Sequence, residues 1–127
     1  MTARSLALLA LTLLLAARGA AAQDAAETHI CLFTQECYET EACADAAFEI
    51  TLEIEDGFAD RAVQGVTVAE TLTGTAYPIG EGGWMAQLGS QIGPALLTLH
   101  DGAARLSMHG GTEAMMINYS GTCEAQD

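Results

Sequence analysis

The chain contains no lysine, and only Arg61 and Arg105 supply positive side chains beyond residue 22. All 17 aspartate and glutamate residues lie in that same part of the chain, so residues 23–127 have a net charge of −15 with the histidines neutral. Nucleic acids and anionic membrane surfaces gain affinity for proteins through lysine and arginine. We therefore expect neither nucleic acid nor a membrane surface as a partner.

Sequence motifs of known catalytic sites are absent as well. The chain has no G-x-S-x-G, H-E-x-x-H, P-loop or G-x-G-x-x-G sequence. It also lacks the C-x-x-C pair that couples two thiols in redox enzymes. The sequence thus predicts a protein that is not an enzyme, with no catalytic residue and no cofactor.

Long apolar runs are confined to the start of the chain. Arg4 precedes an apolar run over residues 5–17, which is too short to span a bilayer comfortably. Ala20 and Ala22 then form an A-x-A cleavage site. We expect residues 1–22 to be a signal peptide that is removed, which leaves a mature form without a membrane anchor.

Residues 23–127 are enough for a single acidic domain with its own core, and too few for two domains. The Ala-, Leu- and Arg-rich leader and the lack of lysine are typical of a bacterial protein. We therefore expect the mature domain to be periplasmic or secreted.

Four cysteines, an even number in an exported chain, predict two disulfides. They are Cys31, Cys37, Cys43 and Cys123. Their spacing lacks the close C-x₂₋₄-C pair that places two thiolates on one zinc ion. Three connectivities are possible, and we favour a local clasp between Cys37 and Cys43 with Cys31 and Cys123 joining the two ends of the domain.

The sequence predicts two parts in the mature chain. We expect a cysteine-pinned segment over residues 23–47, with a loose start and a short helical turn around residues 36–46, followed by a strand meander over residues 48–123. Within the meander, Phe48, Ile50, Leu52 and Ile54 alternate with polar residues, which is typical of a strand with one apolar face. Further candidate strands are residues 62–72, 75–79, 84–88, 95–100, 103–109 and 113–120.

Asp101-Gly102 is a favoured two-residue type I′ hairpin turn, and it sets the pairing of the strands on either side. The resulting register places Leu97 opposite Leu106 and Leu99 opposite Ala104 on one face. The apolar pattern agrees with this turn. Seven or eight short strands without a convincing helix predict an all-β fold, a small antiparallel meander forming a barrel or a sandwich.

A two-residue turn at Asp56-Gly57 would place Leu52 opposite Arg61, so we expect a longer loop there. Gly65 interrupts the apolar alternation around it, which predicts a β-bulge. The expected core consists of Phe48, Ile50, Leu52, Ile54, Val66, Val68, Leu97, Leu99, Leu106, Met108, Ile117 and Tyr119. We also expect Trp84, the only tryptophan, to pack in the core.

Carboxylates are dense around the first predicted strand, where they form a candidate acidic binding face. Its members are Glu49, Glu53, Glu55, Asp56 and Asp60. Such oxygens are calcium ligands, but the chain has no D-x-[DN]-x-[DN]-G loop. Histidine and methionine side chains are copper ligands, yet His100 and His109 lie about 20 Å apart in the predicted hairpin, too far to share an ion. We therefore predict no metal-ligating residue.

These observations favour a non-catalytic exported domain that binds a cationic protein or ligand through its acidic face, for example an inhibitor of a basic hydrolase. A copper- or calcium-binding periplasmic protein and a structural module of the cell envelope are the alternatives.

The stretch Thr73-Gly74-Thr75-Ala76-Tyr77, followed by Trp84, resembles a stretch of the periplasmic lysozyme inhibitors, which are small, cysteine-linked β-barrels. The resemblance covers about a dozen residues. Met85-Ala86 stands where that family has lysine-glycine, so we do not infer membership from it.

Overall fold

The structure, a computed structural model, describes residues 27–57, 60–112 and 114–127. The expected signal peptide, the loose start of the mature chain before residue 27, and position 113 of the last expected strand lie outside the described residues.

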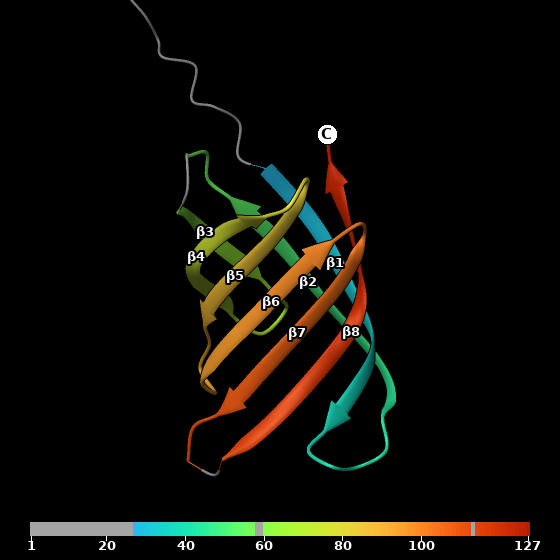
Figure 1. The fold of residues 1–127 in the computed structure, drawn as a ribbon. Helices are drawn as coiled ribbons and strands as arrows, with labels where there is room; N and C mark the ends of the chain where they lie inside the picture. Colours follow the sequence, from blue (N-terminus) through green and yellow to red (C-terminus); the bar gives the residue numbers. More distant parts are fainter. Residues whose placement is uncertain (1–26, 58–59, 113) are drawn as a thin grey trace, which may run out of the picture.

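Eight antiparallel strands form one closed barrel in simple meander order (Figure 1). Each strand pairs with the next along the chain, and the last pairs with the first. The strands are β1 (Glu27–Tyr38), β2 (Ala44–Ile54), β3 (Arg61–Val66), β4 (Thr71–Ile79), β5 (Gly83–Gly89), β6 (Pro94–His100), β7 (Ala103–Gly110) and β8 (Met115–Gln126). The all-β meander is thereby confirmed, and it closes as a barrel.

Side chains alternate between the barrel interior and the outer surface along each strand. In β2, Ile50, Leu52 and Ile54 are fully buried, and the intervening Glu53 is exposed. The interior is filled by apolar side chains from all eight strands. Within the described residues, no helix is long and apolar enough to cross a membrane.

The cysteine-pinned segment differs most from the prediction. No helical turn forms over residues 36–46, because β1 continues to Tyr38 and β2 already begins at Ala44. His29, Cys31 and Phe33 alternate into the interior, which is a strand pattern that the cysteines and polar residues obscure in the sequence. A shift of register between Phe33 and Gln35 interrupts this alternation in the middle of β1.

The predicted strand over residues 62–72 is two strands, because Thr67 begins a tight turn. Its Oγ1 accepts hydrogen bonds from the backbone amides of Ala69 and Glu70, at 3.2 and 3.0 Å. Gly65 forms no bulge, since β3 pairs without a break with both of its neighbours. Gly65 faces inward, where an added Cβ would lie 3.2 Å from Ile50 Cγ2.

This register corrects two predicted core residues. Val66 points outward and is 40% exposed, and Val68 lies in the turn and is fully exposed. The prediction placed both inside because it shifted the alternation at Gly65. Of the other predicted core residues, Phe48, Ile117 and Tyr119 are only partly buried, and the remaining seven are buried.

The hairpin at Asp101-Gly102 has the predicted register, with Leu97 opposite Leu106 and Leu99 opposite Ala104. Both turn residues have positive φ, 49° for Asp101 and 76° for Gly102, as a type I′ turn requires. The connection between β2 and β3 is a longer loop, also as predicted, because Ile54 pairs with Val63.

Disulfides join Cys31 to Cys123 and Cys37 to Cys43, the connectivity that we favoured. Cys31 and Cys123 are directly opposite each other in β1 and β8, so this bond spans the strand pair that closes the barrel. Cys37 and Cys43 clasp the turn between β1 and β2. Two such bonds indicate an oxidising environment outside the cytoplasm.

Candidate acidic groove and barrel-end cluster

A shallow groove of about 470 Å³ lies on the outer surface of β2, β3 and β4. We call it the acidic groove, because Glu53 and Glu55 line it together with uncharged residues. Its other lining residues are Ala62, Val63, Gln64, Thr73 and Gly74. It is therefore a concave surface with two carboxylates and no basic residue in its lining.

Strand pairing explains how these residues meet. Glu53 is directly opposite Gln64 in β3, and Gln64 is opposite Thr73 in β4. Residues that are opposite each other in neighbouring strands project on the same side of a sheet. A carboxylate, an amide and a hydroxyl therefore form a row across the groove.

Small residues form part of this surface. Gly74 is in register with the inward-facing Val63 and Leu88, and a Cβ at its position would overlap with the Gln87 carbonyl oxygen. Glycine is therefore required where β4 and β5 approach so closely. Ala62 adds only a methyl group to the same surface, so longer side chains on both sides stand above a low floor.

The structure brings together two of the five predicted acidic residues. Glu49 is exposed on the outer face of β2, but it does not line the groove. Oδ1 of Asp56 lies 3.9 Å from Nη1 of Arg61 and also accepts a hydrogen bond from the Gly57 amide. Asp60 is exposed beside Arg61, at the edge of the loop that leads into β3.

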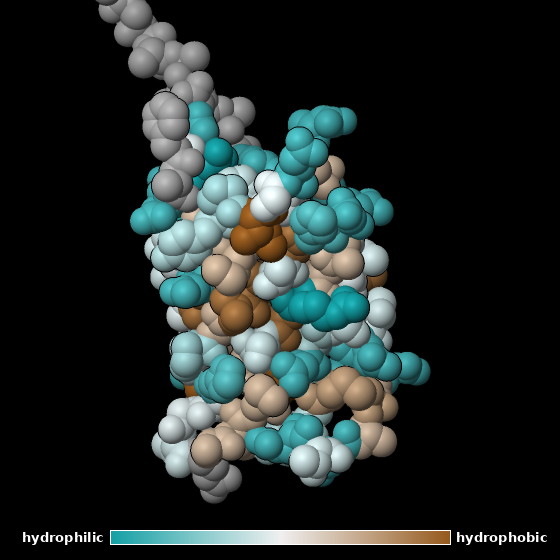
Figure 2. Space-filling view, in the orientation of Figure 1, coloured by the Kyte–Doolittle hydropathy of each residue, from teal (hydrophilic) through white to brown (hydrophobic). Residues whose placement is uncertain are grey.

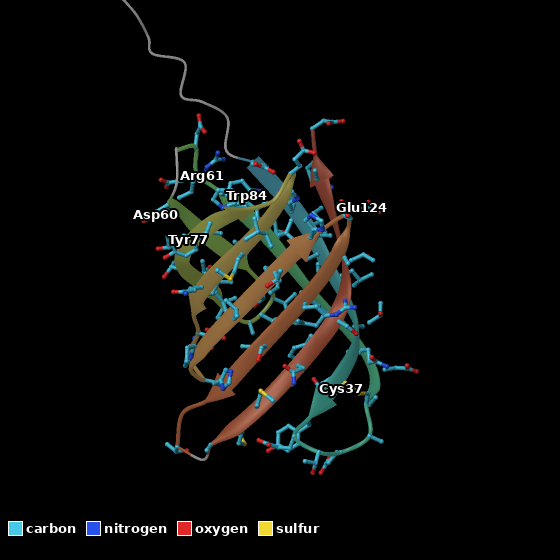
Figure 3. The ribbon with its side chains drawn as sticks, viewed as in Figure 1. Cys37, Asp60, Arg61, Tyr77, Trp84 and Glu124 are labelled. Atoms are coloured by element: carbon cyan, nitrogen blue, oxygen red, sulfur yellow. A yellow bond between two sulfur atoms is a disulfide. The ribbon has the colours of Figure 1, made fainter. Side chains whose placement is uncertain are left out.

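Arg61 does not neutralise the groove, because its guanidinium turns toward the end of the barrel. Nη1 of Arg61 lies 3.9 Å from Oε2 of Glu27, and the guanidinium carbon lies 4.6 Å from the centre of the Trp84 ring. Figure 3 shows Arg61 and Trp84 together at the end of the barrel where β3 and β5 begin. Glu53 and Glu55 have no ion pair among the described residues.

Glu27 is the centre of a polar cluster at that end of the barrel. Trp84 Nε1 donates a hydrogen bond of 3.1 Å to Glu27 Oε1, and His29 Nε2 lies 2.8 Å from the same oxygen. His29 and Trp84 are 6% and 5% exposed. Trp84 is thus a core residue, as predicted. The cluster lies above the apolar interior at this end of the barrel, and among the described residues the Nε atom of Arg61 is buried there without a hydrogen-bond partner.

Sequence reasoning missed this cluster because it treated the start of the mature chain as a loose leader. The sequence did contain a sign of this strand, because the residues that face inward occupy every second position: Glu27, His29, Cys31 and Phe33. That period is typical of a strand whose alternate residues face inward. The residues of the groove that carry no charge, Gln64 above all, gave no comparable signal.

The three histidines have different polar partners. His29 belongs to the barrel-end cluster, His100 lies beside Asp101 with 3.3 Å between Nδ1 and Oδ2, and His109 lies near Ser107. In the part of the chain that the structure describes, no group of three or more histidine, cysteine or acidic side chains is arranged to hold a metal ion.

An aromatic cluster lies toward the opposite end of the barrel. Tyr119 packs against Phe33 and Phe48, with ring centres 6.2 and 5.3 Å away. Burial raises the pKa of the Tyr119 hydroxyl to about 12, and the hydrogen bond and negative charge of Glu36 act in the same direction. Tyr119 is therefore a structural phenol that stays protonated at neutral pH.

The acidic groove is a concave surface whose two carboxylates have no cationic partner among the described residues. Comparisons of the chain with protein-family models, with curated proteins and with solved structures find no match.

Proposed function

We propose that this protein is an exported, non-catalytic binding domain of the bacterial periplasm or exterior, which takes a lysine or arginine side chain of a basic protein into the acidic groove. One observation carries the proposal: Glu53 and Glu55 line a concave surface without a compensating cation. A flat acidic surface would attract cations without orienting them. A groove restricts the position of the bound side chain as well.

The size and chemistry of the groove suit this ligand. Its volume of about 470 Å³ lies within the usual range of about 300–1,000 Å³ for binding sites. Ammonium and guanidinium groups donate hydrogen bonds only, and the carboxylates, Gln64 and Thr73 all offer oxygen acceptors. The apolar stem of lysine or arginine would lie over Ala62 and Gly74.

The charge of the whole domain supports the same partner. With a net charge of −15 for residues 23–127, the domain attracts basic proteins over a distance and speeds their association at low salt. A basic hydrolase such as lysozyme is the concrete candidate. Thr73 and Gly74, from the stretch that resembles the lysozyme inhibitors, both line the groove.

Binding to lysozyme, measured by calorimetry at 20 and 300 mM NaCl, tests the proposal. We expect binding at low salt that weakens at least tenfold at high salt, because exposed charges are screened. The substitutions E53Q and E55Q together should weaken binding at least tenfold at 20 mM NaCl. Lysozyme whose amines have been succinylated should not bind, since it lacks the ammonium groups.

The matched control is E41Q with E124Q, which removes the same two charges from exposed positions outside the groove. If both double variants lose affinity equally, the groove has no specific role and only net charge matters. If lysozyme activity and binding are unchanged at low salt, the lysozyme version is abandoned. A basic probe protein of another fold that also fails to bind would contradict the wider proposal.

A further inference from the structure

The first half of β2 has a neighbouring strand on one side only. β1 pairs with both halves of β2, but β3 pairs only with the part from Thr51 to Ile54. The chain leaves β3 at Val66, opposite Thr51, and turns at Thr67 toward β4. Among the described residues, no strand therefore pairs with residues 44–50 on the side away from β1. We call this side the free edge of β2.

The backbone of the free edge is open to a partner. A strand without a neighbour presents a row of unpaired N–H and C=O groups. In the described part of the chain, no backbone hydrogen bond from a turn or loop reaches residues 44–50. Ala44, Ala46 and Ala47 have only methyl side chains, which leave this backbone accessible. Figures 1 and 2 show the turn that precedes the free edge at the lower end of the barrel, where polar and apolar side chains are mixed.

Side chains along the free edge alternate between an exposed and a partly buried row. Asp45, Ala47 and Glu49 are exposed, whereas Ala46 and Phe48 are partly buried. Neither Asp45 nor Glu49 has an ion pair among the described residues. Residues that are opposite each other on neighbouring strands project on the same side of a sheet. An added strand would therefore place two of its side chains beside these two carboxylates.

We propose that the free edge of β2 binds an extended segment of a basic protein by strand addition, with lysine or arginine opposite Asp45 and Glu49. The unpaired backbone groups select an extended chain, whose N–H and C=O groups have the matching spacing. The carboxylates select a basic chain and oppose a second copy of this one, because like charges would then meet across the strands. The expected segment has basic residues at its first and fifth positions and apolar residues at its second and fourth, which would cover Phe48 and Ala46.

Nuclear magnetic resonance of the isotope-labelled, oxidised processed chain at 20 mM NaCl tests the inference with the capped peptide SKVTVKS at up to 5 mM. We expect saturable shift changes centred on residues 44–50, and slower hydrogen exchange of amides there, because the added strand accepts their hydrogen bonds. The capped control peptide SVKTKVS has the same composition and charge, but its lysines would face inward. It should bind at least about tenfold more weakly.

Substitutions in the protein test the same register. D45N with E49Q should weaken the binding of SKVTVKS at least about fivefold, because two cross-strand charge pairs are lost. The matched control is E81Q with E124Q, which removes the same two charges from exposed positions outside β2. This control should leave the affinity within twofold of the unmodified chain.

The free edge adds a second contact for a basic partner and does not depend on the acidic groove. Glu49 belongs to the free edge and does not line the groove. E53Q with E55Q should therefore leave the binding of SKVTVKS within twofold, although it should weaken the binding of lysozyme to the groove. Failure of either proposal can thus be recognised without the other.

Three results would overturn the inference. One is the absence of saturable shift changes at 5 mM SKVTVKS. Another is equal binding of the two peptides, because net charge alone would then act. The third concerns the chain without peptide, which should sediment as a monomer. A dimer in which the amides of residues 44–50 are protected from exchange would mean that a second copy, and not a basic strand, occupies the free edge.

Discussion

The disulfide between Cys31 and Cys123 should contribute much more to stability than the one between Cys37 and Cys43. The first joins residues that are 92 positions apart, and the second joins residues only 6 positions apart. In the chain-entropy model, closing these loops in the unfolded chain is worth about 4.6 and about 2.3 kcal/mol, respectively. The expected difference is therefore about 2 kcal/mol before packing is considered.

Packing adds to the difference in the same direction. Cys31 and Cys123 are 0% and 6% exposed within the core, whereas Cys43 is exposed at the turn. Replacing the buried pair by alanine removes two sulfur atoms from a closely packed interior, which costs further stability. The buried bond also spans β1 and β8, the pair that closes the barrel.

Urea unfolding of C31A/C123A and of C37A/C43A, followed by the fluorescence of Trp84, measures both effects. We expect C31A/C123A to lose at least about 2 kcal/mol more in the free energy of unfolding. If it does not fold in buffer, titration with trimethylamine oxide will locate its folding transition relative to that of C37A/C43A. Equal stability of the two double variants would refute the reasoning, because loop length and burial would then have no effect.

Three further predictions concern single positions. The substitution G74A should lower the free energy of unfolding in urea by more than about 3 kcal/mol or prevent folding, because the new Cβ overlaps with the Gln87 carbonyl oxygen. G89A, whose added Cβ has its nearest contact at 3.7 Å, is the control and should cost less than about 1 kcal/mol. The substitution W84F removes the indole donor to Glu27 and should lower the free energy of unfolding by about 1–3 kcal/mol. A change within about 0.3 kcal/mol would show that this hydrogen bond adds nothing to stability. Because the pKa of Tyr119 is raised from 10.0 to about 12 in the folded state, its contribution to stability is complete below pH 10 and is lost as the pH rises through about 12. Titration of tyrosinate absorbance should lose its component near pH 12 in Y119F, and an unchanged titration would contradict the assignment.

Local patterns predicted much of the barrel because they act over a few residues. The alternation from Phe48 to Ile54 and the turn at Asp101-Gly102 each restrict the backbone without help from distant segments. The helical turn over residues 36–46 was wrong for the same reason. Nothing local reveals that β1 is held on one side by β2 and on the other by β8, and this pairing extends the strand through its polar part to Tyr38.

The acidic residues were predicted as a face, but only part of that face lines the groove. Glu53 and Glu55 line the groove because β3 and β4 place Gln64 and small residues beside them. Asp56 turns to Arg61 instead, and that contact depends on Glu27 and Trp84 from distant strands. Composition therefore predicted an acidic surface, and strand pairing located the concavity in it.

The sequence by itself determined the all-β class, the even set of cysteines and the large negative charge, because each follows from side-chain chemistry or from a period of two residues. Only the tertiary structure decided the closure of β8 on β1, the barrel-end cluster around Glu27, and the position of the acidic groove. The physical reason is that these features depend on which strands become neighbours. Which strands pair is determined when the whole chain buries its apolar side chains together, and no short segment of sequence specifies that pairing.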